Sequence, residues 1–400
     1  MNPILTCVSA CAACVVLSAV IAITFGFGLP LGADGTRDFV QYWSAWRLLQ
    51  QGINPYDAAL MHSVQASVGQ PPGITTMMWN PPWVPVLLSP ILDLPFETAA
   101  LVWFVCNLSI MLVVGACIPR ALGYQSPPLW VYGAGACFLP CIDCLKWGQL
   151  SLVHTLGFVL FLYCVRNTWY LLTGVVTALL MSKPHLFVLC IVPGFFWFVG
   201  LKKTSRQALI VGAGMATITL TAITLLYCPN AFAWWMEGIR GPTTGLGVVS
   251  VREWQTATLA TIVRTVIWSS TGSPPDWPLW AFPLLGGVLT AAYFRVRRQP
   301  IVWSDSAPAL LCLSCLFASY GWFYDQSVLI VSHFYLLCRA AGDCSPRARY
   351  VTLAGLAVIQ GTIIAINLLT VSAQHYYVWV PAAYLGLIWI CSRPSTQSNI

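Results

Sequence analysis

Apolar runs long enough to cross a lipid bilayer recur along this 400-residue chain from one end to the other. A helix that spans the hydrocarbon core needs roughly 20 mostly apolar residues. Inside lipid, a helix satisfies its own backbone hydrogen bonds. Only 8% of the residues are charged, whereas an average soluble domain has about 25%. The sequence therefore predicts an all-α polytopic membrane protein and excludes a soluble enzyme.

We expect about 12 transmembrane helices in a single integral membrane domain that covers residues 1–400. The first, near 4–28, lacks the basic start of a signal peptide and is too long for a signal-peptide core, so we expect it to be retained. The others are expected near 98–118, 129–143, 149–165, 168–182, 184–200, 207–227, 277–294, 307–319, 322–338, 350–371 and 376–392.

The distribution of charges predicts the orientation of these spans. With a cytoplasmic N-terminus, 12 of the 19 lysines and arginines fall inside, including the clusters at 202–206 and 295–298. This agrees with the positive-inside rule. Ten of the 12 acidic residues fall outside. We therefore expect a multi-pass protein of the cell (inner) membrane, with any acid–base chemistry on the extracytoplasmic face.

Two long outer loops, 30–97 and 228–276, interrupt the series of spans. In the first, residues 37–51 have aromatic residues at helical spacing with polar residues between them, which predicts an amphipathic helix. Residues 83–94 are apolar but short and rich in proline, which predicts a second helix that lies on the bilayer surface. If 83–94 crossed the membrane, the basic clusters would fall outside.

Three charged residues at the outer edge are candidates for a site. Asp38 begins the amphipathic helix, where a carboxylate either caps the helix N-terminus or has a function. Lys183 lies between two apolar runs, where it either extends to the membrane surface or binds an anion. Asp325 lies at the outer start of a predicted span, where hydration does not explain an acid so close to hydrocarbon.

Other polar residues have structural explanations. Lys146 can pair with Asp143, three residues earlier on the same helix. His154 and His333 each stand alone in an apolar run, and we expect both to be hydrogen-bonded core histidines. The net charge of +7 is scattered along the chain, whereas nucleic-acid binding needs basic residues on one face.

The motifs of several enzyme classes are missing from the sequence. There is no nucleotide-binding P-loop, dinucleotide-binding fingerprint, zinc-protease motif or serine-hydrolase motif. Cys141 and Cys144 have the spacing of half a zinc site. Other pairs at this spacing, Cys11–Cys14 and Cys312–Cys315, lie inside apolar runs, where cysteines act as small hydrophobes, and no histidine pair lies nearby. We therefore expect no metal and no cofactor. The short cytoplasmic loops leave no room for a nucleotide-binding domain.

Five short motifs occur in the same order as in glycosyltransferase family 87, which the chain resembles. That family comprises polyprenyl-phosphate-mannose-dependent mannosyltransferases of the GT-C type. The motifs occupy residues 37–57, 80–90, 148–151, 183–185 and 319–325. The chain departs from the family pattern at Asn80, Ser151 and His185, and residues 324–326 stand where the family has histidines.

The resemblance implies a GT-C-type fold and a membrane glycosyltransferase with an extracytoplasmic active site. Such an enzyme moves a sugar, here expected to be mannose, from a polyprenyl-phosphate donor to a glycolipid or glycan acceptor, with inversion. By this resemblance Asp38 is the general base, and Lys183 and Lys146 bind the donor phosphate. The residues expected to contact the substrates are Tyr42, Tyr56, Gln149, His185, Trp322, Tyr324 and Asp325.

A secondary transporter or flippase of a lipid-linked or small polar substrate is the main alternative. Transporters usually place their charged sites near the middle of the membrane, whereas the candidates here gather at its outer edge. A membrane scaffold without catalytic activity is a third interpretation, and it leaves the positions of Asp38 and Lys183 unexplained.

Overall fold

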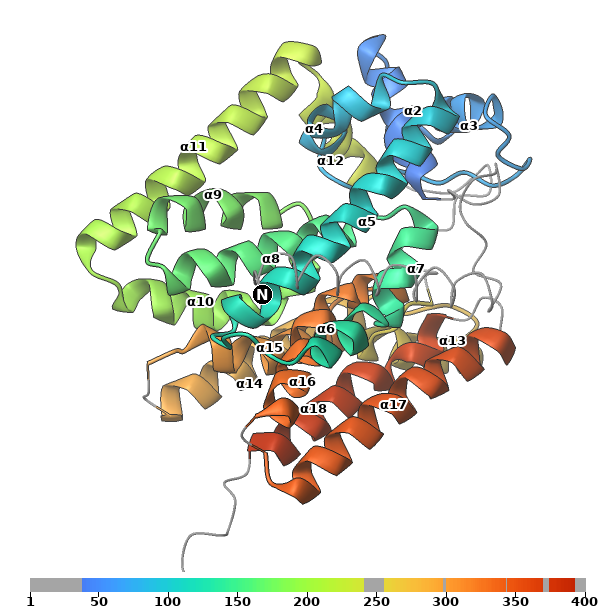
Figure 1. The fold of residues 1–400 in the computed structure, drawn as a ribbon. Coiled ribbons are helices and arrows are strands. Elements are labelled where there is room, and N and C mark those ends of the chain that lie inside the picture. The colour runs from blue at the N-terminus through green and yellow to red at the C-terminus, as the bar shows by residue number, and fades with distance from the viewer. Residues whose placement is uncertain (1–37, 241–254, 298–299, 343, 370–373, 393–400) are drawn as a thin grey trace, which may run out of the picture.

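The structure is a computed structural model that describes residues 38–240, 255–297, 300–342, 344–369 and 374–392. These residues form helices joined by turns and loops, and they contain no strand. Figure 1 shows a group of short helices at one end of the molecule and the helices α16, α17 and α18 at the other. The helix expected near 4–28 lies outside the described residues.

Within the described part of the chain, four helices are both long and apolar enough to cross a membrane. They are α5 (Phe96–Ala121), α11 (Lys203–Tyr227), α14 (Pro278–Arg297) and α17 (Pro346–Leu369). The shorter apolar helices include α8 (Ser151–Arg166), α9 (Tyr170–Leu180), α10 (Val188–Gly200) and α15 (Trp303–Phe317). The structure thus supports a helical membrane protein, and the full count of twelve spans stays a prediction.

The span predicted at 129–143 is broken in the structure. It consists of α6 (Leu129–Ala136) and α7 (Leu139–Trp147), which are bent by 47° and make a fifth span if counted together. Pro140 lies in the first turn of α7. A proline there cannot donate a backbone hydrogen bond to the preceding turn, so a continuous helix through this point is disfavoured.

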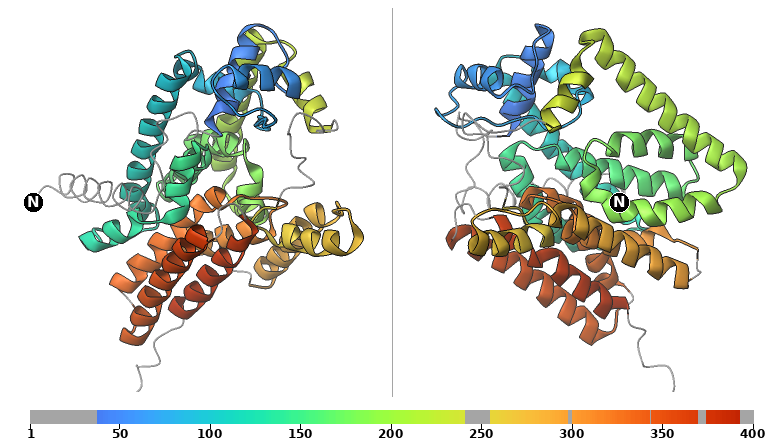
Figure 2. Two further views of the ribbon diagram at one scale, coloured as in Figure 1. Left: turned by 90° about the vertical axis from the view of Figure 1, so that its right-hand side faces the viewer. Right: turned by 180° about the vertical axis from the view of Figure 1, so that it is seen from behind.

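The outer loops contain more helix than the sequence suggested. Both helices expected in the first loop are confirmed, as α2 (Phe39–Gln50) and α4 (Trp83–Leu92), and α3 (Ala58–Ala66) lies between them. The second loop contains α12 (Ala231–Arg240) and α13 (Leu259–Thr271). Figures 1 and 2 show α2, α3, α4 and α12 together at one end of the molecule. We call these four helices the outer cap.

The prediction that α2 has one face open to solvent is wrong, and its position at the membrane surface stays a prediction. Ten of its twelve residues are buried, because α3, α4 and α5 pack around it. Two polar side chains on α2 bond to the residue that ends α4. The Trp46 indole and the Gln50 amide both donate to Asp93 Oδ1 at 2.7 Å. Polar residues between aromatic ones therefore did not indicate a solvent-facing stripe here.

The α9 and α11 helices pack closely, side by side in Figure 1. A Cβ added at Gly174 would overlap the carbonyl of Leu209, and one at Gly212 would overlap the carbonyl of Leu171. Small residues let membrane helices approach in this way. The outward side of α11 is apolar and open, with Ile218 70% exposed, as suits a surface that faces lipid.

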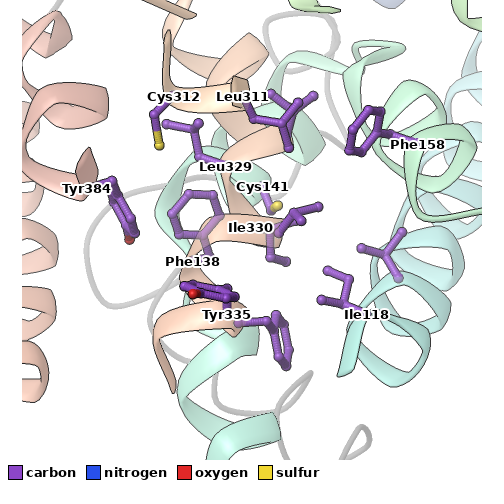
Figure 3. Packing of buried hydrophobic residues seen from close by; sticks show 14 of the residues in the cluster. Ile118, Phe138, Cys141, Phe158, Leu311, Cys312, Leu329, Ile330, Tyr335 and Tyr384 are labelled. Atoms are coloured by element: carbon purple, nitrogen blue, oxygen red, sulfur yellow. The ribbon is translucent and has the colours of Figure 1, made fainter. Parts of the chain in front are cut away.

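The main apolar core lies between α7 and the C-terminal helices. Figure 3 shows Phe138, at the start of α7, between Ile330 and Tyr384. Ile330 begins α16 (Ile330–Ala341), and Tyr384 belongs to α18 (Trp379–Ser392). Directly before α16 the chain forms the 3-10 helix η3 (Phe323–Leu329), all of it buried. This packing holds η3 against α7 and α8.

Candidate active site

One hydrogen-bonded cluster joins four segments that are far apart in the sequence. The segments are the start of α2, the turn between α7 and α8, the residues around the 3-10 helix η1 (Pro184–Phe187), and η3. We call the group the polar cluster, and its members are Asp38, Tyr42, Gln149, Ser151, Lys183, Tyr324 and Asp325.

Asp38 is positioned by the turn that ends α7. Its backbone N–H donates to the Trp147 carbonyl at 3.2 Å. The next residue, Gly148, has a φ of 66°, which L side chains rarely adopt. A Cβ at Gly148 would lie 2.9 Å from Cβ of Phe39. Asp38 makes no side-chain capping bond to α2. Its carboxylate is instead directed to the polar cluster, so the capping explanation is wrong.

Gln149 is the centre of the polar cluster. Its amide nitrogen donates to Asp38 Oδ2 at 2.7 Å and to the Tyr324 hydroxyl at 3.2 Å. Its amide oxygen accepts from the Tyr42 hydroxyl at 3.0 Å and from Lys183 Nζ at 3.2 Å. Gln149 is 4% exposed, and these four bonds satisfy both ends of its buried amide.

Lys183 points into the protein rather than toward the membrane surface. It forms a buried ion pair with Asp325 Oδ1 at 3.0 Å and donates to Ser151 Oγ at 3.2 Å. Ser151 in turn donates to Asp325 Oδ1 at 2.6 Å. The Lys183 ammonium also lies 5.5 Å from the centre of the Tyr324 ring, within range of a cation–π contact. The snorkelling explanation of Lys183 is therefore wrong.

Two partly buried rings border Asp325. The Trp322 backbone N–H donates to Asp325 Oδ2 at 3.0 Å, and the Trp322 ring stacks on Tyr324 with centroids 6.2 Å apart. His185 Nε2 lies 3.9 Å from the same oxygen of Asp325, beyond hydrogen-bond distance. The His185 ring lies against Tyr320, with centroids 4.2 Å apart.

The electrostatic setting of Asp38 suits a proton acceptor. Burial raises the pKa of Asp38 to about 6, although the Gln149 hydrogen bond and the positive charge of Lys183 act in the opposite direction. A carboxyl group with a pKa near neutrality can accept a proton in one step and release it afterwards. Asp38 as a whole residue is only partly buried.

The comparison with known families was decisive. The sequence model of glycosyltransferase family 87 matches residues 78–319, more than half of the chain. The chain belongs to glycosyltransferase family 87. No match was found among curated proteins or among solved structures.

As a family 87 member, the protein is a membrane glycosyltransferase, and this sets aside the transporter and scaffold interpretations. The matched region contains Gln149, Ser151 and Lys183, but it ends before Tyr324 and Asp325 and begins after Asp38. In the tertiary structure, hydrogen bonds join the residues outside the matched region to those within it. The bonds link Asp38 and Tyr324 to Gln149, and Asp325 to Ser151 and Lys183.

Two of the expected site residues lie apart from the polar cluster in this family 87 protein. Tyr56 donates its hydroxyl to the Asn80 carbonyl at 3.1 Å and packs within the outer cap. Lys146 lies in the last turn of α7, partly exposed, directly before Trp147. Ser151, which the sequence analysis did not name as a site residue, belongs to the cluster. Its position two residues after Gln149, in the same short motif, was the available signal.

Two histidines outside the polar cluster are hydrogen-bonded within the core. His154 bonds to the Leu150 carbonyl and to Ser182 Oγ, at 2.8 and 2.7 Å. His333 bonds to the Tyr384 hydroxyl at 2.7 Å, so both predicted core histidines are confirmed. In the described ranges, no three histidine, cysteine or acidic side chains come together as a metal site requires.

Proposed function

We propose that this protein transfers a sugar, with mannose expected, from a polyprenyl-phosphate donor to a glycolipid or glycan acceptor, with Asp38 as general base. We further propose a GT-C-type fold and an active site on the extracytoplasmic face of the cell (inner) membrane. The observation that supports the proposal best is Asp38 itself. A carboxylate whose pKa is raised by burial lies beside a buried network of donors and charges.

The proposed reaction is a single displacement. Asp38 accepts the proton of an acceptor hydroxyl while the oxygen of that hydroxyl attacks the anomeric carbon of the donor sugar. The bond from that carbon to the phosphate oxygen breaks, and polyprenyl phosphate leaves with the electron pair. Attack opposite the leaving group inverts the configuration. Asp38 then returns its proton to solvent.

The other expected roles are assigned by position. Of the two lysines that the family resemblance assigns to the donor phosphate, Lys146 is the proposed cation, because it is more accessible than Lys183. The partly buried rings of His185 and Trp322 border the polar cluster, where aromatic faces can pack on a sugar. The buried members of the polar cluster that we expect to contact the substrates are Tyr42, Gln149, Tyr324 and Asp325. For Tyr56 we propose a contact with the acceptor at the outer cap.

The test is the variant Asp38→Asn, assayed in membranes with a polyprenyl-phosphate sugar. An amide of the same shape cannot accept the proton, so we expect transfer to fall by at least about 100-fold. Glu97→Gln is the matched control, because Glu97 is an exposed carboxylate at the start of α5, and its activity should be unchanged. Full activity of a folded Asp38→Asn protein would refute the assignment.

A further inference from the structure

We propose that Lys183 is a positioning residue that acts on Asp38 through the Gln149 side chain, and that it does not bind the donor phosphate directly. The inference rests on the proposed role of Asp38 as general base. It departs from the expectation that Lys183 neutralises the departing phosphate, and it leaves that contact to Lys146.

The first step is that the hydrogen-bonding capacity of Lys183 is already used. An ammonium group has three N–H donors and no acceptor. Lys183 Nζ has three acceptors within 3.2 Å, on Gln149, Ser151 and Asp325. The residue is 8% exposed, and the Asp325 carboxylate balances its charge. A phosphate would have to displace one of these buried partners, whereas an ammonium that binds an anion directly should have a donor free.

The second step concerns the orientation of the Gln149 amide. Because Lys183 can only donate, the amide oxygen of Gln149 must face it, at 3.2 Å. The amide nitrogen then faces Asp38 Oδ2, at 2.7 Å. With the amide turned over, its N–H groups would face the ammonium and its oxygen would face the carboxylate. Both contacts would be repulsive. Lys183, at the oxygen end of the amide, therefore directs the amide N–H toward Asp38.

The third step is the consequence for the base. A hydrogen bond donated to a carboxylate favours its ionised form, and only the ionised form of Asp38 accepts a proton. The same bond fixes the Asp38 side chain relative to the end of α7. Gln149 follows that helix end closely, and the Asp38 backbone N–H donates to Trp147, the last residue of α7. Lys183 thus keeps Asp38 ionised and in place without contacting the substrate. Its partner Asp325 keeps the ammonium in position.

The experiment is a double-mutant cycle read out by pH profiles of kcat/KM and by the KM for the polyprenyl-phosphate donor. One arm is Lys183→Met combined with Asp325→Asn, which removes both charges and leaves no unpaired buried ion. The second arm is Gln149→Leu, and the third combines all three changes. Lys146→Met is the comparison for direct phosphate binding. Gel filtration in detergent checks that each variant is folded.

If Lys183 acts through Gln149, the first two arms should each move the acid limb of the profile upward by about one pH unit. The triple variant should move it no further, since both changes remove the same interaction. The donor KM should stay within about twofold in the first arm. Lys146→Met should raise the donor KM by about tenfold, as loss of a charged hydrogen bond does, with the acid limb unmoved.

Two results would overturn the inference. One is a first arm that raises the donor KM and leaves the acid limb in place, which would make Lys183 a phosphate ligand. The other is a triple variant whose shift equals the sum of the two separate shifts, which would mean that Gln149 does not transmit the effect. Failure of the proposed function is a different result, because then Asp38→Asn would retain activity.

Discussion

Asp38, Gln149 and Lys183 show how single residues divide the work of one buried polar network. A buried ion pair is weak support for stability, because desolvation of the two charges offsets their attraction. The Lys183–Asp325 pair is 3.0 Å long and lies in an interior that the chain could have filled with apolar side chains. Its value is therefore better explained by what it orients, which is the Gln149 amide that contacts Asp38.

The pH dependence of transfer follows from the state of Asp38. Since its pKa is raised to about 6, the proportion of ionised Asp38 falls as the pH drops through that value. We expect kcat/KM to be half-maximal near pH 6 and to fall about tenfold per pH unit below it, with a plateau above. Initial rates between pH 4.5 and 8 test this, and a plateau that extends down to pH 4.5 would contradict the raised pKa.

At the level of helices, the turn between α7 and α8 positions Asp38, the proposed base. α7 ends at Trp147, Gly148 reverses the chain with a positive φ, and Gln149 follows at once. The Gly148 carbonyl accepts from the Trp103 indole at 2.8 Å, so α5 also fixes the turn. This turn thus fixes Asp38, at the start of α2, through two contacts. Trp147 accepts from its backbone N–H, and Gln149 donates to its carboxylate.

The variant Gly148→Ala tests this turn. The new Cβ would lie 2.9 Å from Cβ of Phe39, so Asp38 must shift, and a displacement of this kind can lower the rate by about 100-fold. Strain at a positive φ should also cost about 1 kcal/mol of stability. Gly272→Ala is the matched control, because Gly272 has a φ of 75° with nothing within 4 Å of its added Cβ.

Gly272→Ala should lower the melting temperature by a similar amount while leaving transfer unchanged. Activity assays and thermal unfolding in the same detergent give both values. Equal activity in the two variants would mean that the close approach of Gly148 to Phe39 does not position Asp38.

On the scale of the whole molecule, the described helices separate into lipid-facing and protein-facing surfaces. The open apolar side of α11, the same kind of surface on α14, and the glycine contact between α9 and α11 suit a bilayer. The outer cap and the polar cluster lie together, joined by the Asp38 backbone and Gln149.

Topology reporters test the orientation of the whole chain. A reporter inserted within residues 241–254 should be detected outside the cytoplasm, and one placed within 298–302 should be detected inside, because the basic cluster at 295–298 favours retention. Detection of both reporters on the same side would contradict the alternation of spans. Detection of the first in the cytoplasm would move the proposed active site to the other face.

The sequence by itself determined the class of the protein. Two features indicated it, namely the composition of the apolar runs and a series of short motifs. Apolar length and scarcity of charge predict membrane helices because lipid imposes the same requirement on every span. Short motifs indicated family 87 and pointed to Asp38, Gln149, Lys183 and Asp325. These signals are local or compositional, and neither depends on how distant segments pack.

Only the tertiary structure decided how those residues are arranged. Sequence spacing could not show that Asp325, 142 residues after Lys183, takes one of its three donors, or that Gln149 turns its nitrogen toward Asp38. Nor could it show that α2 is enclosed, because a stripe of aromatic residues looks the same against lipid and against protein. Contacts between distant segments depend on helix packing, and that packing buries Lys183 against Asp325 instead of leaving it an exposed cation.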